Sequence, residues 1–154
     1  MTMPPSDVTN PARGRLWFPS LARFHAAFRG PSIVVLRVAA GIALVMHGYG
    51  KIANPFGNVG MVESLGFHPG VFWSPLLAGT EFIGGIFLAL GFLTRPAALG
   101  GMIVLLVTVW FHWIVKEQGY AGSEKSILWA AICFYFVAHG GQYLAVDRAL
   151  PREV

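Results

Sequence analysis

Six ionisable side chains occur inside long apolar stretches of this sequence, where a charged group is costly. They are Arg37, His47, Lys51, Glu81, His112 and His139. Ionisable residues within membrane-spanning segments are rare, and they usually face the interior of a helix bundle or a wet cavity. A histidine, a lysine and a carboxylate together supply a hydrogen-bond donor, a cation and a titratable proton. These residue types therefore predict a site for a ligand that is held by hydrogen bonds and exchanges protons.

Helical spacing predicts which of these side chains can meet. His47 and Lys51 are four residues apart and share one helix face, and Arg37 lies about 40° from Lys51 around the same helix. Glu81 lies near the middle of its own apolar stretch. We expect an outer pocket of His47, Lys51, Glu81 and His112, and a separate inner site that contains Arg37 and His139.

Glycines accompany both parts of the expected outer pocket. Gly48 and Gly50 leave the backbone beside His47 open to a neighbouring helix or to a ligand. Gly85 lies on the same stripe as Glu81, and small residues of this kind favour close helix contact in lipid.

Each candidate also has a purely structural interpretation. Glu81 can form an ion pair with Lys51 or Arg37 that fixes helix register, since either partner removes the cost of an isolated buried charge. Arg37 can extend its side chain toward lipid headgroups, and Lys51 can stabilise the end of its helix. His112 and His139 lie near the interfaces, where a histidine is often simply solvated.

Other chemistries find little support in the sequence. His47 and His112 are the one histidine pair that could hold a haem, but haem also needs a wide apolar slot. The single cysteine, Cys133, excludes an internal dithiol and a cysteine-rich metal site. No metal-binding motif, phosphate-binding glycine loop or nucleophilic serine elbow is present, so we expect no metal.

The elements that must position these residues are membrane-spanning helices. Hydrophobic residues make up 55% of the 154 residues and charged residues 12%, which excludes a soluble α/β enzyme, a disordered chain and a disulfide scaffold. Four stretches are long enough to cross a bilayer, at roughly 20 residues each: residues 32–53, 72–93, 96–115 and 125–146. The sequence thus predicts an all-α, polytopic membrane protein built as a four-transmembrane-helix bundle. Residues 54–71, with one helical turn near 61–65, and residues 116–124 are expected to be loops.

The distribution of Lys and Arg predicts the orientation. The side that holds the two termini carries Arg13, Arg15, Arg23, Arg29, Arg95, Arg148 and Arg152, and the other side carries Lys51, Lys116 and Lys125. Seven against three places both termini in the cytoplasm and explains the net charge of +4 without a nucleic-acid partner. Residues 1–31 are expected to be a separate basic arm that ends at Gly30-Pro31, either a helix lying on the inner leaflet or plain disorder, and residues 147–154 a short cytoplasmic tail.

Two runs of residues resemble the signatures of a known family. Leu36-Arg37, Gly41 and the run HGYGK at residues 47–51 resemble the first-helix signature of the DoxX family. The runs EFIGG at 81–85 and GFLTRP at 91–96 resemble its second signature. The resemblance covers about residues 32–146 and implies a small multi-pass protein of a prokaryotic inner membrane.

DoxX-like proteins are associated with a terminal quinol oxidase and with thiosulfate:quinone oxidoreduction. The resemblance thus implies a quinone-linked redox protein or a subunit of a membrane oxidoreductase complex, with quinone as the ligand and a redox partner subunit as the source of electrons. The alternative is a non-catalytic anchor, assembly factor or module for binding or transporting a small solute. An oligomer is compatible with both of these functions.

Overall fold

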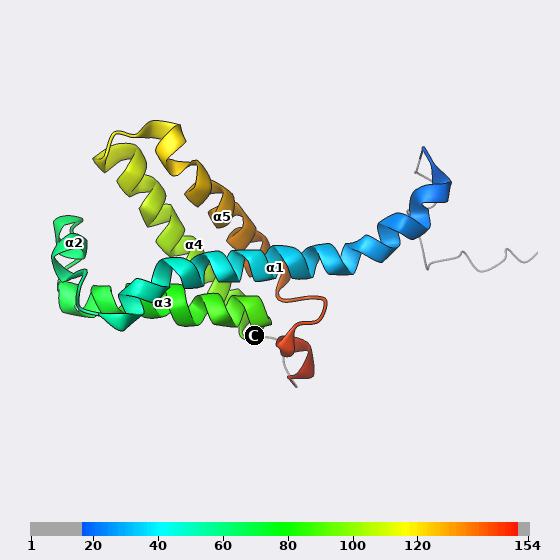
Figure 1. Ribbon diagram of the computed structural model, residues 1–154, viewed down its shortest axis with the longest axis horizontal. Helices are drawn as coiled ribbons and strands as arrows, with labels where there is room; N and C mark the ends of the chain where they lie inside the picture. The colour runs from blue at the N-terminus through cyan, green and yellow to red at the C-terminus, as the bar shows by residue number, and fades with distance from the viewer. Residues whose placement is uncertain (1–16, 151–154) are drawn as a thin grey trace, which may run out of the picture.

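The computed structural model describes residues 17–150, which fold into helices joined by short connections and contain no strand (Figure 1). The α-helices are α1 (Ala22–Ala53), α2 (Val59–Ser64), α3 (Gly70–Leu90), α4 (Thr94–Trp110) and α5 (Gly119–His139). Short helical turns cover Pro19–Leu21 and Val146–Ala149, and a π-helical turn, Phe111–Val115, extends α4. The predicted all-α class is confirmed.

Three helical segments of the described chain are long and apolar enough to cross a membrane: Ala22–Ala53, Gly70–Leu90 and Thr94–Val115. α5 has 21 residues, the same length as α3, but it carries Glu124 and Lys125 in its first two turns. Its apolar run is correspondingly shorter. The protein is therefore a multi-pass helical membrane protein, and the fourth span stays a prediction.

The last predicted span, 125–146, is wrong at both ends. α5 begins at Gly119, so most of the loop expected at 116–124 is helical. α5 ends at His139 because Gly140 adopts φ 69° and ψ −168°, a conformation that glycine tolerates and that takes the chain out of the helix. Gln142 and Leu144 also have positive φ values, so residues 140–145 form an irregular strap.

The expected break at Gly30-Pro31 is also wrong, because α1 runs through both residues without interruption for 32 residues. Pro31 has no N–H group to donate to the carbonyl of Ala27, which weakens the helix there without ending it. α1 bends in this region, and its N-terminal part projects beyond the bundle (Figure 1). Residues 1–16 and 151–154, with Arg13, Arg15 and Arg152, lie outside the described residues.

α1 and α3 form an antiparallel pair whose backbones touch. A Cβ atom added at Gly41 would lie 2.6 Å from the carbonyl oxygen of Gly85, and one added at Gly48 would lie 2.6 Å from the amide nitrogen of Phe82. The two glycines are seven residues apart and therefore face the same partner. Gly48 thus admits a helix and not a ligand, whereas a Cβ at Gly50 would meet nothing within 4 Å.

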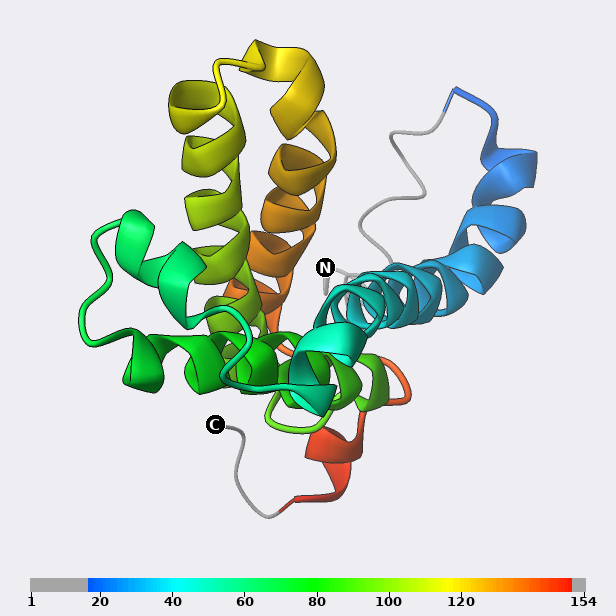
Figure 2. The ribbon, with the colours of Figure 1, turned by 60° about the vertical axis from the view of Figure 1, so that its left-hand side comes forward.

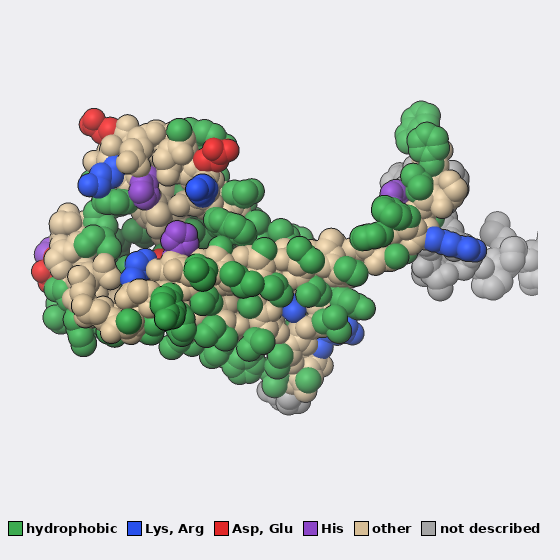
Figure 3. Space-filling view, in the orientation of Figure 1, with side chains coloured by type: hydrophobic (Ala, Val, Ile, Leu, Met, Phe, Trp, Pro, Cys, Tyr) green, Lys and Arg blue, Asp and Glu red, His purple; other side chains and the backbone are tan. Residues whose placement is uncertain are grey.

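α4 and α5 form a second antiparallel pair, which stands steeply across α3 (Figure 2). The pairs meet where a Cβ at Gly100 would lie 3.0 Å from Thr80 and one at Gly101 would lie 2.9 Å from Leu44. The buried apolar core lies at this crossing and consists of Ala40, Leu44, Leu88, Ala97, Ala98, Leu105, Ala130, Cys133 and Phe136. Hydrophobic side chains also cover much of the outer surface, and charged ones gather toward the ends (Figure 3), as expected for a bundle in lipid.

Candidate functional site

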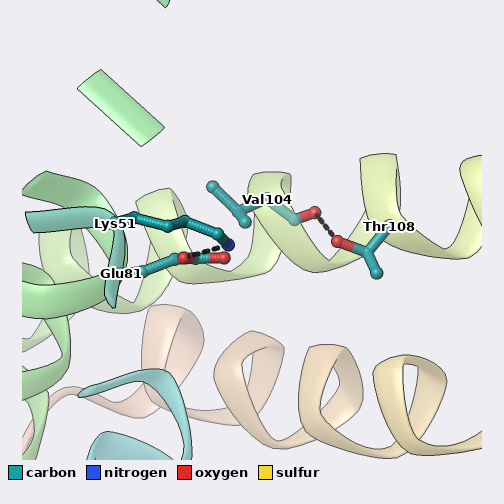
Figure 4. A network of polar contacts seen from close by, with 4 residues as sticks. All are labelled: Lys51, Glu81, Val104 and Thr108. Atoms are coloured by element: carbon teal, nitrogen blue, oxygen red, sulfur yellow. Dashed lines mark hydrogen bonds and ion pairs between the residues drawn. The ribbon is translucent and has the colours of Figure 1, made fainter. Parts of the chain in front are cut away.

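Glu81 forms an ion pair with Lys51, across the contact between α1 and α3 (Figure 4). The Lys51 Nζ and Glu81 Oε2 atoms are 2.5 Å apart. The side chain of Glu81 is 6% exposed and that of Lys51 is 27% exposed. Of the two partners that the sequence allows for Glu81, the structure selects Lys51. A buried carboxylate thus has its counter-charge on the neighbouring helix, with the cation on the more open side.

The helical repeat explains why Lys51 lies at an opening. Ala40, Leu44, His47 and Lys51 form one stripe along α1, at spacings of four, three and four residues. Ala40 and Leu44 are buried in the core where the helix pairs cross. His47 and Lys51 continue the stripe beyond this crossing and are exposed and half-buried, respectively. If the crossing of the helix pairs extended further along α1, the positions of His47 and Lys51 would be buried in the core. Here these two positions carry polar side chains that stay accessible.

Gly48 brings the acidic partner within reach. A Cβ atom at Gly48 would lie 2.9 Å from the Cβ atom of Glu81, so the two helices touch at the level of the ion pair. Any larger residue at position 48 would separate Glu81 from Lys51. The glycine beside His47 in the HGYGK run is therefore part of the site through helix packing.

α4 supplies a second polar stripe. Gly101, Leu105, Thr108 and His112 follow one face, and the first two are buried. The hydroxyl of Thr108 donates to the carbonyl of Val104 at 2.9 Å, one helical turn back along α4 (Figure 4). On the face seen in Figure 3 a notch separates the two helix pairs, and histidine and basic side chains gather around it.

The four residues of the expected outer pocket thus differ in the contacts that they make. Lys51 and Glu81 are in direct contact. His47 is exposed and makes no hydrogen bond within residues 17–150. His112 lies in the π-helical turn, where its Nδ1 atom is 2.7 Å from Oε1 of Gln118. The pair Lys51–Glu81 is therefore the centre of the candidate site, and that all four bind one ligand stays a prediction.

Arg37 lies midway along α1, at the strap end of the bundle, and its guanidinium is fully hydrogen-bonded. Its guanidinium donates to the carbonyls of Gly141, of Tyr143 at 3.1 Å and of Leu144 at 3.0 Å. Nε donates to the carbonyl of Ala89 at 3.4 Å. With 2% of its surface exposed, Arg37 does not extend toward headgroups, so that interpretation is wrong. The guanidinium instead satisfies the carbonyls that the strap after α5 leaves without helical partners.

Asp147 completes this end of the bundle and was not identified from the sequence. Its carboxylate accepts from the amides of Leu93 at 2.7 Å and Thr94 at 2.9 Å, and from the Thr94 hydroxyl at 2.5 Å. It thereby caps the N-terminus of α4 from a distant part of the chain. Arg37, Thr94, Asp147 and the backbone of residues 141–144 are called the Arg37 latch below. An acidic residue directly after a run of uncharged residues was its signal in the sequence.

His139 does not join Arg37 in an inner site. Its ring stacks on Tyr135 with centroids 4.3 Å apart, and its Nδ1 atom lies 3.0 Å from the Tyr135 carbonyl oxygen. Gln142 donates to the Tyr135 hydroxyl at 3.0 Å, so Tyr135 contacts both His139 and Gln142. The side chain of His139 is exposed. Among residues 17–150 no group of three His, Cys, Asp or Glu side chains is placed to hold a metal ion.

Comparison with known proteins agrees with the motifs. The family model described as DoxX matches residues 32–113, which include the ion pair and most of the residues that surround it. The inner membrane protein YqjF of Escherichia coli (strain K12) is 37% identical over 81 residues, 52% of this chain and 61% of that protein. The match thus spans less than two thirds of the relative's length. No solved structure matches the chain.

Proposed function

The chain belongs to the DoxX family of integral membrane proteins, and we propose that it is a quinone-linked redox protein or a subunit of a membrane oxidoreductase complex. The observation that carries this proposal is the Lys51–Glu81 pair, which joins α1 to α3 one helical turn from the exposed His47. A quinone reaches these side chains by diffusing within the bilayer. The electrons come from a partner subunit, since no cofactor motif is present in the sequence.

The three side chains match the needs of a quinone headgroup. A quinone accepts hydrogen bonds at two oxygens and takes up two protons when it is reduced by two electrons. Lys51 donates to one oxygen and stabilises negative charge as it develops there. His47 donates to the other, and the Glu81 carboxylate, released when Lys51 turns toward the ligand, can take up a proton and pass it on.

The second candidate is a non-catalytic anchor or assembly module. It is favoured by the same pair, because Lys51 and Glu81 already satisfy each other at 2.5 Å without any ligand. In that case the pair serves only to fix the register of α1 against α3, as buried ion pairs do in some helical assemblies.

The proposed topology has α5 as a fourth span and both termini in the cytoplasm. It is supported by the exposed arginines Arg23, Arg29, Arg95 and Arg148, which belong to the segments at the strap end of the bundle. A cysteine introduced at Ala121 in a Cys133→Ala protein should react with an impermeant maleimide from the periplasmic side of intact cells. Reaction only after the membrane is opened would reverse the orientation.

The functional proposal is tested by quinone binding. Glu81→Gln and Lys51→Met proteins in nanodiscs should bind decylubiquinone at least about tenfold more weakly than the parent, the loss of about 1.4 kcal/mol expected for a charged hydrogen bond. Lys125→Met is the matched control, because Lys125 is exposed at the start of α5. Folded variants that bind decylubiquinone as well as the parent would contradict the redox proposal and favour the anchor interpretation.

A further inference from the structure

The N-terminal part of α1 carries an apolar stripe that nothing in the described chain covers. Phe24 and Phe28 are 59% and 56% exposed, and their rings lie 4.5 Å apart on one side of the helix. Leu21 continues the stripe, and Trp17, just before the helix, is 95% exposed. Residues 17–31 are called the overhang below. A cluster of large exposed side chains of this kind marks an interaction surface.

The flanks of this stripe are cationic. Arg23 and Arg29 lie about 120° to either side of the stripe, at 100° per residue, and both are exposed. No acidic residue occurs between positions 17 and 62. An apolar stripe with basic flanks is complementary to the boundary between acyl chains and anionic headgroups.

The direction of the overhang fits this surface. α1 bends near Pro31, so the overhang turns aside from the bundle toward the side of α4 and α5 (Figure 1). In Figure 3 hydrophobic side chains lie along the side of the overhang that faces this helix pair, and a basic side chain points the other way. The apolar side of the overhang is thus turned toward the same side of the molecule as α4 and α5.

The base of the overhang is held in place and leaves a groove. The ring of Tyr143 packs on Gly30, where an added Cβ would lie 2.9 Å from Cδ1. Tyr143 is itself fixed by Arg37, which binds its carbonyl. A groove of about 340 Å³ remains beside this contact and is lined by Arg29, Ile33 and Gln142 among others. Arg29 thus stands at the edge of a cavity with apolar and polar walls.

We propose that the overhang is an interfacial anchor that binds anionic phospholipids, with its apolar stripe among the acyl chains and Arg23 and Arg29 on the headgroup phosphates. Arg29 offers two parallel N–H donors, which suit a phosphate. Fixing the overhang on the membrane surface also fixes the tilt of α1, and through α1 the position of Lys51. The anchor does not depend on the proposed quinone chemistry.

The test follows the environment of the overhang in the full-length protein. A Phe24→Cys protein, in a Cys133→Ala background, is labelled with the fluorophore NBD and placed in nanodiscs of phosphatidylcholine alone or mixed with phosphatidylglycerol. We expect quenching by aqueous iodide to fall about threefold or more when the anionic lipid is present. A label at Ala22, about 140° around the helix from the stripe, should change much less.

Charge variants separate lipid recognition from other causes of protection. Arg23→Gln combined with Arg29→Gln should abolish the effect of phosphatidylglycerol at position 24, whereas Lys116→Gln combined with Lys125→Gln should leave it intact. Equal quenching in both lipid mixtures would overturn the proposal. Protection that is lost on dilution to one protein per disc would instead identify a second copy as the occupant, and would overturn it as well.

Discussion

Two positions along α1 use buried charge in different ways. Midway along the helix, at the strap end of the bundle, the guanidinium of Arg37 is 2% exposed and binds four backbone carbonyls, three of them on the strap that follows α5. Near the C-terminal end of α1, Lys51 is 27% exposed and binds a single side chain, Glu81. The two residues are fourteen positions apart, about 21 Å along one helix.

The difference lies in what each partner can do. Backbone carbonyls cannot change protonation state or turn away, so the Arg37 latch fixes a structure. A carboxylate can take up a proton and a lysine side chain can change rotamer, so the Lys51–Glu81 pair can be opened by a ligand. The latch therefore holds α1, α3, α4 and the strap together, and it leaves the C-terminal part of α1 free to carry the site.

The largest effect should come from Arg37→Met. It leaves carbonyls buried without donors and removes the link between α1 and the strap, which should lower the free energy of unfolding by about 3 kcal/mol or more. Titration with SDS in mixed micelles measures this loss. Arg95→Met is the control, because Arg95 is exposed at the same end. Equal losses in both variants would contradict the role of Arg37 in the latch.

A comparison of two glycines in one helix should give the next largest effect. Gly48→Ala places a Cβ atom 2.6 Å from the Phe82 nitrogen, and the helix backbones must separate, at about 1–3 kcal/mol. Gly50→Ala meets nothing within 4 Å and should raise stability by about 0.5–1 kcal/mol through helix propensity. The same SDS titration should show opposite signs. A neutral Gly48→Ala would mean that helix contact does not set the position of Glu81.

The sequence predicted the apolar helices and the possible partners of Glu81 better than the ends of the helices. Apolar length was enough to locate α1, α3 and α4, and helical spacing was enough to show that Lys51 and His47 share one face of α1. Both follow from local periodicity, which is a property of each segment by itself. The pairing partner of Glu81 depended on how two helices cross, and the sequence left two choices open.

The strap and the latch could not be predicted in the same way. α5 ends at His139, although apolar residues occur as far as Val146, because Gly140 and Gly141 permit the chain to turn out of the helix. The backbone carbonyl of Gly141 then accepts a hydrogen bond from Arg37 on another helix. Asp147 caps α4 from more than fifty residues away. Such contacts depend on tertiary structure, and a single sequence carries no periodic signal for them.

A smaller effect is expected at this cap. Asp147→Ala removes the acceptor for three donors at Leu93 and Thr94 and should cost about 1–2 kcal/mol, the usual loss for a helix N-cap. Thr94→Val should lose part of the same energy, and the two changes should not be additive because they share one hydrogen bond. Arg148→Ala, next to Asp147 but exposed, should change little. Full additivity would contradict the shared cap.

The smallest effect on stability should come from Glu81→Gln, although this residue is the centre of the site. Gln still accepts a hydrogen bond from Lys51, and Lys51 is open enough to find water or headgroups, so the loss should stay within about 1 kcal/mol. Lys51→Met should cost more, because it leaves the more deeply buried Glu81 without a counter-charge. SDS titration of both variants beside Arg37→Met gives the ranking. If Glu81→Gln destabilises the protein as much as Arg37→Met does, the Lys51–Glu81 pair is as structural as the latch, which favours the anchor interpretation.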